Sequence, residues 1–180
     1  MSIRLTQIFG RHVLAPSPSD ADDTPLRPSS EAVPHDLIEL LFFAYRDFVG
    51  DPDRILADYG FGRAHHRVLH FVQRRPGLTI AELLDILQIT KQSLNRVLKE
   101  LVEKGYIEQR TGRQDKRQRH LHTTPSGQDL ALRLVRLQAK RINRALEGAN
   151  PETAAIAARY LAALIDPAER PKVERLLDRP

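Results

Sequence analysis

Basic side chains are concentrated in one short stretch of the chain, RTGRQDKRQR at residues 110–119. Five of its ten residues are Arg or Lys, and one acid, Asp115, lies two positions before Arg117. Guanidinium and ammonium groups donate charge-assisted hydrogen bonds to phosphate oxygens, so this stretch has the chemistry to bind a polyanion. A solvated loop or a basic tail has the same composition, and the flanking residues must decide between these interpretations.

The excess positive charge of the whole chain lies around this stretch. The 180 residues include 28 basic and 23 acidic side chains, a net charge of +5. Residues 88–119 hold nine of the basic and four of the acidic side chains, so this segment alone has a charge of +5. Charge that serves only solubility would be spread more evenly. The segment therefore predicts a polyanionic partner.

Two helices joined by a tight turn precede the basic stretch. Thr79 and Glu82 form a T-x-x-E capping box, which predicts a helix over residues 80–87. The next helix is expected over 90–104 and ends at Gly105, a residue suited to a left-handed helix terminus. Its apolar residues follow a single stripe along one face. The stripe consists of Leu94, Val97, Leu98, Leu101 and Val102.

Two expected strands, 105–110 and 118–123, flank the basic stretch and make it the tip of a β-hairpin. Thr124 followed by Pro125 is typical of a helix N-cap and first helical position, and a long helix is expected to follow, ending near Leu146. Two helices, a tight turn and a basic hairpin predict a mainly α, winged helix-turn-helix fold with a small β-hairpin wing.

The second helix of the pair exposes polar side chains suited to DNA. In this fold its N-terminal residues enter the major groove, where Gln and Asn can pair with adenine and Arg with guanine. Thr90, Ser93 and Lys99 are better suited to phosphates. Each residue alone is more often an ordinary solvated side chain, and only their combination with the hairpin favours double-stranded DNA as a partner. The expected contacts are Thr90, Lys91, Gln92, Ser93, Asn95, Arg96 and Lys99.

Residues 62–130 resemble the MarR family of bacterial transcription regulators. The resemblance rests on LTIAELLDIL–ITKQSLNRVLKELVEKGYIEQR, on D-x-R ending at Arg117, and on TTPSG before the next helix. GRAHHRVLHFV and ITKQSLNRVLKELVEKGY also resemble the PetP-like branch of this family. The resemblance implies an obligate homodimer whose N- and C-terminal helices form the interface. It further implies a repressor that binds a pseudo-palindromic operator and responds to a small-molecule effector.

The resemblance also gives roles to the wing. It implies that Arg117 reaches into the minor groove while Asp115 orients the hairpin, and a narrow A·T-rich groove does attract arginine. The expected wing contacts are Arg110, Arg113, Asp115, Lys116, Arg117 and Arg119. The chain departs from the family pattern twice, with Gln88 in place of a glycine in the interhelical turn and Thr123 in place of a leucine.

The chain is expected to divide into four parts, and its first helix must be covered on two sides. Residues 36–49 are apolar nearly all round, which indicates a second copy of the chain as the outer cover. The parts are a flexible, Pro-rich extension (1–35), a dimerisation helix with its connection (36–61), the winged helix-turn-helix (62–124) and C-terminal dimerisation helices (125–180).

Aromatic residues and histidines raise two ligand hypotheses. A phenolic or aromatic-acid effector is the general expectation for the family, and Phe42, Phe43, Tyr45, Phe48 and Phe71 are candidates for its pocket, although a core or interface role is commoner for each. His66 and His70, expected on the polar side of a helix over 62–75, have the i, i+4 spacing of zinc ligands. Without a cysteine or a nearby third ligand, no metal or cofactor is expected. A metal-responsive regulator is kept as an alternative.

Other function classes find little support. The chain has no G-x-S-x-G, no phosphate-binding glycine loop and no H-E-x-x-H, so an enzyme is not expected. No apolar run approaches about 18 residues, and residues 1–14 lack a signal-peptide core, so a cytoplasmic protein without a membrane partner is expected. A sequence-tolerant architectural DNA-binding protein would use the same charges and is a further alternative.

Overall fold

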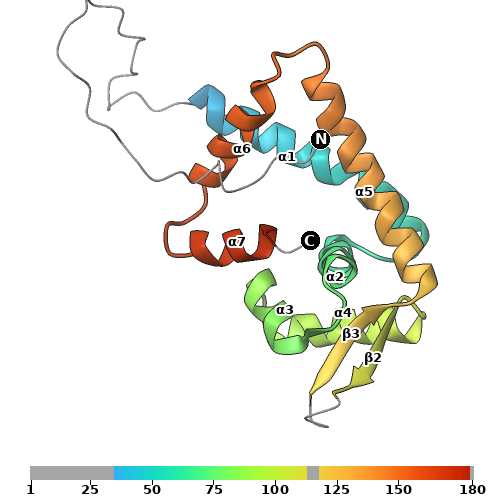
Figure 1. Cartoon of the computed structure of the whole chain (residues 1–180). Helices are drawn as coiled ribbons and strands as arrows, with labels where there is room; N and C mark the ends of the chain where they lie inside the picture. The colour runs from blue at the N-terminus through green and yellow to red at the C-terminus, as the bar shows by residue number, and fades with distance from the viewer. Residues whose placement is uncertain (1–34, 113–117, 179–180) are drawn as a thin grey trace, which may run out of the picture. The chain divides into compact units, whose positions relative to one another are not determined.

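A computed structural model describes residues 35–112 and 118–178 as seven helices and three strands (Figure 1). The helices are α1 (His35–Asp58), α2 (Arg63–Arg74), α3 (Ile80–Leu87), α4 (Lys91–Glu103), α5 (Pro125–Leu146), α6 (Thr153–Ala163) and α7 (Arg170–Leu177). The strands are β1 (Leu78–Thr79), β2 (Ile107–Thr111) and β3 (Arg119–Thr123). Residues 39–145 form one compact unit, and α6 and α7 belong to a second. The predicted winged helix-turn-helix is confirmed and lies in the first unit.

Three antiparallel strands in the order β1-β3-β2 form the wing sheet. Ile107 pairs with Thr123 at the base of the hairpin and Thr111 with Arg119 at its outer end. Beyond that pair, the N–H of Gly112 donates to the carbonyl of Gln118 at 3.0 Å. The basic stretch is thus flanked by paired strands, as the sequence predicts.

One apolar core joins the helices of this unit to the sheet. Leu69 from α2, Leu83 from α3, Leu101 from α4, Leu121 from β3 and Leu134 from α5 are all fully buried in it. Burying each such side chain contributes about 1.5–3 kcal/mol to folding. The core therefore holds α4 and the wing against one common scaffold.

Side-chain caps begin the helices where the sequence predicts them. The hydroxyl of Thr79 accepts the N–H of Glu82 at 3.2 Å, and the Glu82 carboxylate accepts the N–H of Thr79 at 2.8 Å. Thr90 accepts the N–H of Ser93 at 3.2 Å, and α4 ends before Gly105, whose φ is +74°. At the start of α5, the hydroxyl of Thr124 accepts the N–H of Gly127 at 3.1 Å.

The first helix is longer than the sequence predicts. A helix over 36–49 was expected, but α1 continues through the buried Pro52 to Asp58. Proline removes one backbone hydrogen bond from a helix interior, which favours an end at that point. Ile55 and Leu56 beyond it pack on the core, with Leu56 fully buried. Tertiary packing therefore overrides the local signal.

Two further expectations about helix faces are wrong. In α2, His66 is buried, so it does not lie on the polar side of the helix. In α4, Val102 is 37% exposed because it borders a surface groove. Pro171 lies in the first turn of α7, where a missing N–H has no helical partner to lose.

At each of the chain's two departures from the family pattern, the residue present makes a side-chain hydrogen bond. Thr123 donates from its hydroxyl to the side-chain oxygen of Gln73 at 2.7 Å, so a polar contact joins β3 to α2. Gln88, at the end of α3, has φ 51° and ψ 44°, the left-handed conformation that favours glycine. Its side-chain amide donates to the carbonyl of Asp85 at 2.7 Å, which offsets part of this cost.

Replacing Gln88 with glycine is expected to raise the free energy of unfolding by about 0.5–1 kcal/mol, because glycine adopts the left-handed conformation without steric cost. Urea unfolding monitored by circular dichroism measures the change. Gln88→Ala is the matched control, since alanine keeps the steric cost and loses the hydrogen bond to Asp85. A glycine variant no more stable than the alanine variant would contradict strain at this turn.

Candidate nucleic-acid interface

The two faces of α4 have opposite roles. Leu94, Val97, Leu98 and Leu101 are buried against the core, which fixes the helix. All of the expected contact residues on its other side are exposed, namely Lys91, Gln92, Ser93, Asn95, Arg96 and Lys99. Thr90 precedes the helix as its N-cap, and its hydroxyl donates to that of Ser93 at 2.9 Å. The exposed side presents amide, guanidinium and ammonium donors, the groups that read base edges and bind phosphates.

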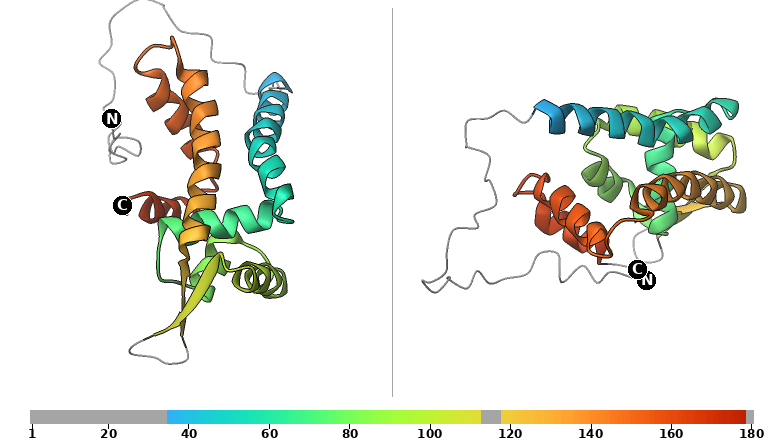
Figure 2. Two further views of the ribbon diagram at one scale, coloured as in Figure 1. Left: turned by 90° about the vertical axis from the view of Figure 1, so that its right-hand side faces the viewer. Right: turned by 90° about the horizontal axis from the view of Figure 1, so that it is seen from above.

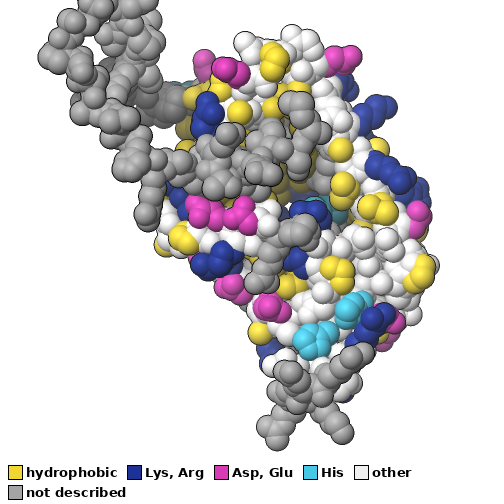
Figure 3. Space-filling view, viewed as in Figure 1, with side chains coloured by type: hydrophobic (Ala, Val, Ile, Leu, Met, Phe, Trp, Pro, Cys, Tyr) yellow, Lys and Arg dark blue, Asp and Glu magenta, His cyan; other side chains and the backbone are white. Residues whose placement is uncertain are grey.

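The β2–β3 hairpin adds two described arginines. Arg110 is exposed and donates through Nε and Nη2 to Oε1 of Glu108, at 2.9 and 2.5 Å. Arg119 is also exposed and donates to the hydroxyl of Thr111. Histidine and basic side chains are visible together near this end of the molecule (Figure 3). The other expected wing contacts, Arg113, Asp115, Lys116 and Arg117, lie outside the described residues.

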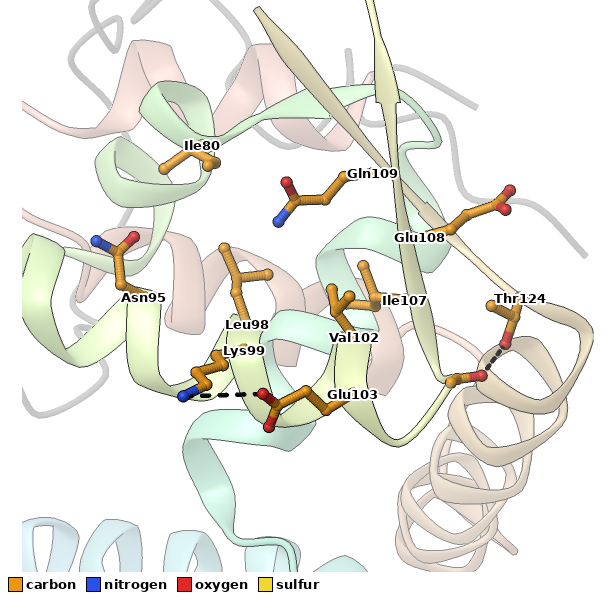
Figure 4. A pocket seen from close by; sticks show the side chains of 11 residues that line it. Ile80, Asn95, Leu98, Lys99, Val102, Glu103, Ile107, Glu108, Gln109 and Thr124 are labelled. Carbon is orange, nitrogen blue, oxygen red and sulfur yellow. Dashed lines mark hydrogen bonds and ion pairs between the residues drawn. The ribbon is translucent and has the colours of Figure 1, made fainter.

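A groove of about 680 Å³ runs between α4 and β2 (Figure 4). Asn95 and Lys99 line it from the helix, and Glu108 and Gln109 line it from the strand. Its apolar lining includes Ile80, Leu98, Val102 and Ile107. Glu103 also lines the groove and lies 3.8 Å from the ammonium group of Lys99. Sequence reasoning missed Glu103, Glu108 and Gln109, because only the fold brings the end of α4 and the start of β2 to one groove.

Two charged residues of the basic segment hold α4 in place. Glu100 accepts a hydrogen bond from Nε2 of His65 at 2.9 Å, since the other ring nitrogen accepts the N–H of Gly62. Lys104 donates to the carbonyl of Tyr59 at 2.7 Å and lies 4.6 Å from the ring centre of Phe61. These contacts fix α4 to the start of α2 and to the residues just before it, so Glu100 and Lys104 have structural roles.

A second cavity, of about 270 Å³, lies between α1, α2 and α5. Tyr45, Phe48 and Phe71, three of the aromatic residues named as pocket candidates, line it. Phe42 is not among the lining residues: it is 63% exposed and its ring packs against that of Phe43. The other lining residues are Val49, Arg63, His66, Arg67, His70 and Gln138.

The positive charge of this cavity comes from arginine. Burial lowers the pKa of His66 and of His70, so both imidazoles are mainly neutral at pH 7. Arg67 donates to the hydroxyl of Tyr45 at 3.1 Å, and Arg63 pairs with Asp53 at 2.7 Å. The cavity therefore combines aromatic walls with guanidinium groups.

The long α5 leads from the sheet toward α1 (Figure 2). Arg133 donates to the hydroxyl of Tyr59 at 2.6 Å, and Arg141 pairs with Asp51 of α1 at 2.7 Å. The hydrogen bond from Arg141 lowers the pKa of Asp51, which keeps this carboxylate charged over a wider pH range. The contacts connect the wing, through α5, to α1.

Neither a metal cluster nor a membrane span is found in the described part of the chain. Among residues 35–112 and 118–178, no group of three His, Asp or Glu side chains is placed to hold a metal ion. His66 is buried, and His120 on β3 contacts the carbonyl of Gly77 at 2.8 Å. No helix of these residues is long and apolar enough to cross a bilayer.

Comparison with known proteins gives matches in sequence and in fold. The model of the MarR family matches residues 59–118. The HTH-type transcriptional regulator PetP of Rhodobacter capsulatus is 49% identical over 141 residues, which cover 78% of this chain and 85% of that protein. Streptococcus pneumoniae FabT in complex with DNA has a TM-score of 0.65 at 21% identity, covering 72% of this chain and 93% of that one.

A mutant MarR of E. coli complexed with operator DNA is similar in fold as well. Its TM-score is 0.57 at 20% identity, and the match covers 73% of this chain and 94% of that one. These structures support the winged helix-turn-helix fold, and the match to PetP extends well beyond it along the chain. The chain therefore belongs to the MarR family, whose members are transcription regulators and not enzymes.

Proposed function

We propose that the chain is a homodimeric repressor that binds double-stranded DNA at a pseudo-palindromic operator. The observation that carries this proposal is the exposed, donor-rich face of α4 beside the arginines of the β2–β3 hairpin. Each subunit places α4 in a major groove and its wing in the flanking minor groove, with half-sites about one helical turn apart. FabT in complex with DNA and the mutant MarR complexed with operator DNA share the fold, which supports DNA as the partner.

Exposed apolar side chains support the homodimer. On α1, consecutive turns leave Leu37, Ile38, Leu40, Leu41, Phe42, Phe43 and Tyr45 exposed. The second unit exposes its own set, Ile156, Tyr160, Leu161, Leu164 and Leu177. Apolar surfaces of this kind mark protein interfaces when they are contiguous. A second copy of the chain covers them in the proposed dimer, and sedimentation velocity measures the oligomeric state directly.

Selection of bound sequences from a random pool of DNA duplexes tests the proposed function. We expect a palindromic consensus, because two identical subunits read two half-sites related by twofold symmetry. Enrichment of a single, non-repeated half-site would contradict the dimeric geometry. Binding without any enrichment would favour a sequence-tolerant architectural protein instead.

Replacing Arg117 with alanine is expected to weaken binding to every duplex. The family resemblance gives this residue the minor-groove contact, so its loss should reduce the slope of log K against log salt by about one to two units per dimer. Titrations at several salt concentrations measure both quantities. An unchanged affinity and slope would remove Arg117 from the proposed contact.

The cavity between α1, α2 and α5 supports a small aromatic acid as effector. Its aromatic walls include Tyr45, Phe48 and Phe71, and Arg63 and Arg67 provide guanidinium groups for a carboxylate. Calorimetric titration with salicylate as the probe tests this second proposal, with Arg67→Ala as the variant expected to lose binding. Equal affinity of wild type and variant would exclude the cavity as the site. No arrangement of the described residues favours the metal-responsive alternative.

A further inference from the structure

Two carboxylates lie on the surface that is proposed to meet DNA. Glu103, in the last turn of α4, and Glu108, on β2, both border the groove between these elements, but the side chain of Glu108 points away from α4, on the opposite side of the strand from Gln109 (Figure 4). Each carboxylate is paired with a base, Glu103 with Lys99 at 3.8 Å and Glu108 with Arg110 at 2.5 Å. We infer that Glu103 and Glu108 limit the affinity of the protein for DNA, because they compete with DNA phosphates for the side chains of Lys99 and Arg110.

The inference rests on the proposed function, which places one sugar–phosphate strand of the DNA over the groove. If α4 lies in a major groove and the hairpin in the adjacent minor groove, the sugar–phosphate strand between the two grooves must run between helix and hairpin. The lining suits such a strand, since the amides of Asn95 and Gln109 can donate to phosphate oxygens. The apolar floor can pack against deoxyribose. Glu103 is therefore the carboxylate inside the groove that opposes a phosphate, whereas Glu108 acts from the other face of the strand, through its ion pair with Arg110.

Helix stability does not explain Glu103. The negative end of the helix dipole lies at the last turn of α4, where a carboxylate is unfavourable. The order Lys99 before Glu103 is also the poorer orientation for an i, i+4 pair. Their side chains are 74% and 62% exposed, and ion pairs so exposed contribute little to folding. Neutralising Glu103 should therefore leave stability unchanged or slightly improved.

The ion pair of Glu108 with Arg110 is shorter than that of Glu103 with Lys99. Both Nε and Nη2 of Arg110 donate to the same carboxylate oxygen, at 2.9 and 2.5 Å. The neighbours across the sheet are histidines, His122 opposite Glu108 and His120 opposite Arg110. Arg110 must leave this pair before it can bind a phosphate, and the carboxylate of Glu108 then remains close to the phosphate that Arg110 binds. Both steps oppose DNA binding.

Glu108→Gln tests the inference, because glutamine removes the charge and keeps the shape. At about 0.1 M salt we expect the affinity for DNA to rise about five- to tenfold per subunit, because Arg110 becomes free to bind a phosphate and displace its counterion. The salt slope should steepen by about one unit per subunit. Fluorescence anisotropy with the selected operator and with an unrelated duplex of equal length should show the same change for both. Glu103→Gln should act in the same direction, with an unchanged urea midpoint.

Two controls separate the inference from its alternatives. Asp47→Asn breaks a similar pair, Arg46–Asp47 at 2.9 Å, outside the groove, so it should change neither affinity nor slope in protein that sedimentation velocity shows to be as dimeric as the wild type. In an Arg110→Gln background, Glu108→Gln should lose most of its effect. Tightening by Asp47→Asn as large as by Glu108→Gln would overturn the inference, and so would an unchanged slope in Glu108→Gln. If the wild type bound neither duplex at low salt, the proposed function would fail, and the inference with it.

Discussion

Replacing Gly127 with alanine is expected to lower the free energy of unfolding by about 3 kcal/mol or more. A Cβ atom at this position would lie 1.9 Å from the carbonyl oxygen of Tyr106 and 2.9 Å from its carbon. These are backbone atoms, and that oxygen also accepts the N–H of Thr124 at 3.1 Å. The close contact therefore cannot relax without separating α5 from the base of the wing. Urea unfolding of the two proteins measures the loss.

Gly50→Ala is the matched control for this substitution. Gly50 is also helical, but a Cβ there meets only the end of the Arg54 side chain, at 4.0 Å. Alanine has the higher helix propensity, so we expect a gain of about 0.5–1 kcal/mol. The two glycines should thus respond with opposite signs. Similar losses in both variants would show that the contact with Tyr106 is not the cause.

Arg96→Ala is expected to relax the sequence preference of DNA binding. Arg96 is exposed on the outer side of α4, where a bidentate pair with guanine is worth about 1–3 kcal/mol per subunit. Loss of that pair should weaken the selected operator by about tenfold or more per subunit, while unrelated duplexes change much less. Competition titrations with single-base variants of the operator measure the preference.

Lys99→Ala provides the comparison for Arg96. An ammonium group bound to phosphate contributes to all sequences alike, so this variant should weaken every duplex by a similar factor. It should also reduce the salt slope. If Arg96→Ala gave the same uniform loss, Arg96 would be a phosphate contact and the proposed base readout would be wrong at this position.

Local chemistry was enough to predict most of the central elements. The capping box at Thr79, the cap at Thr90 and the pair Thr124–Pro125 each satisfy helix ends with groups a few residues away, so their signals are contained in short windows of sequence. The apolar stripe of α4 needed no more than helical periodicity. The exposed residues of its other face followed from the same periodicity.

Features that depend on distant contacts could not be predicted. The continuation of α1 past Pro52 depends on the burial of Leu56, and the burial of His66 on neighbours from other helices. The groove that brings Glu103 and Gln109 together depends on the placement of β2 beside α4. The sequence indicates that aromatic residues line a pocket. Only the fold shows that Phe48 lines the cavity and Phe42 does not.

The shortest strand has a consequence for exchanging parts between relatives. β1 has only two residues, but Leu78 pairs with Leu121 and Thr79 with His120, and the same Thr79 caps α3. Backbone pairing with β1 thus joins the wing to the start of the helix-turn-helix, about forty positions earlier in the chain. A chimera that takes residues 107–123 from a relative would join a foreign hairpin to a native edge strand. Grafts of the wing should therefore carry residues 77–79 with them, so that both halves of the sheet come from one parent.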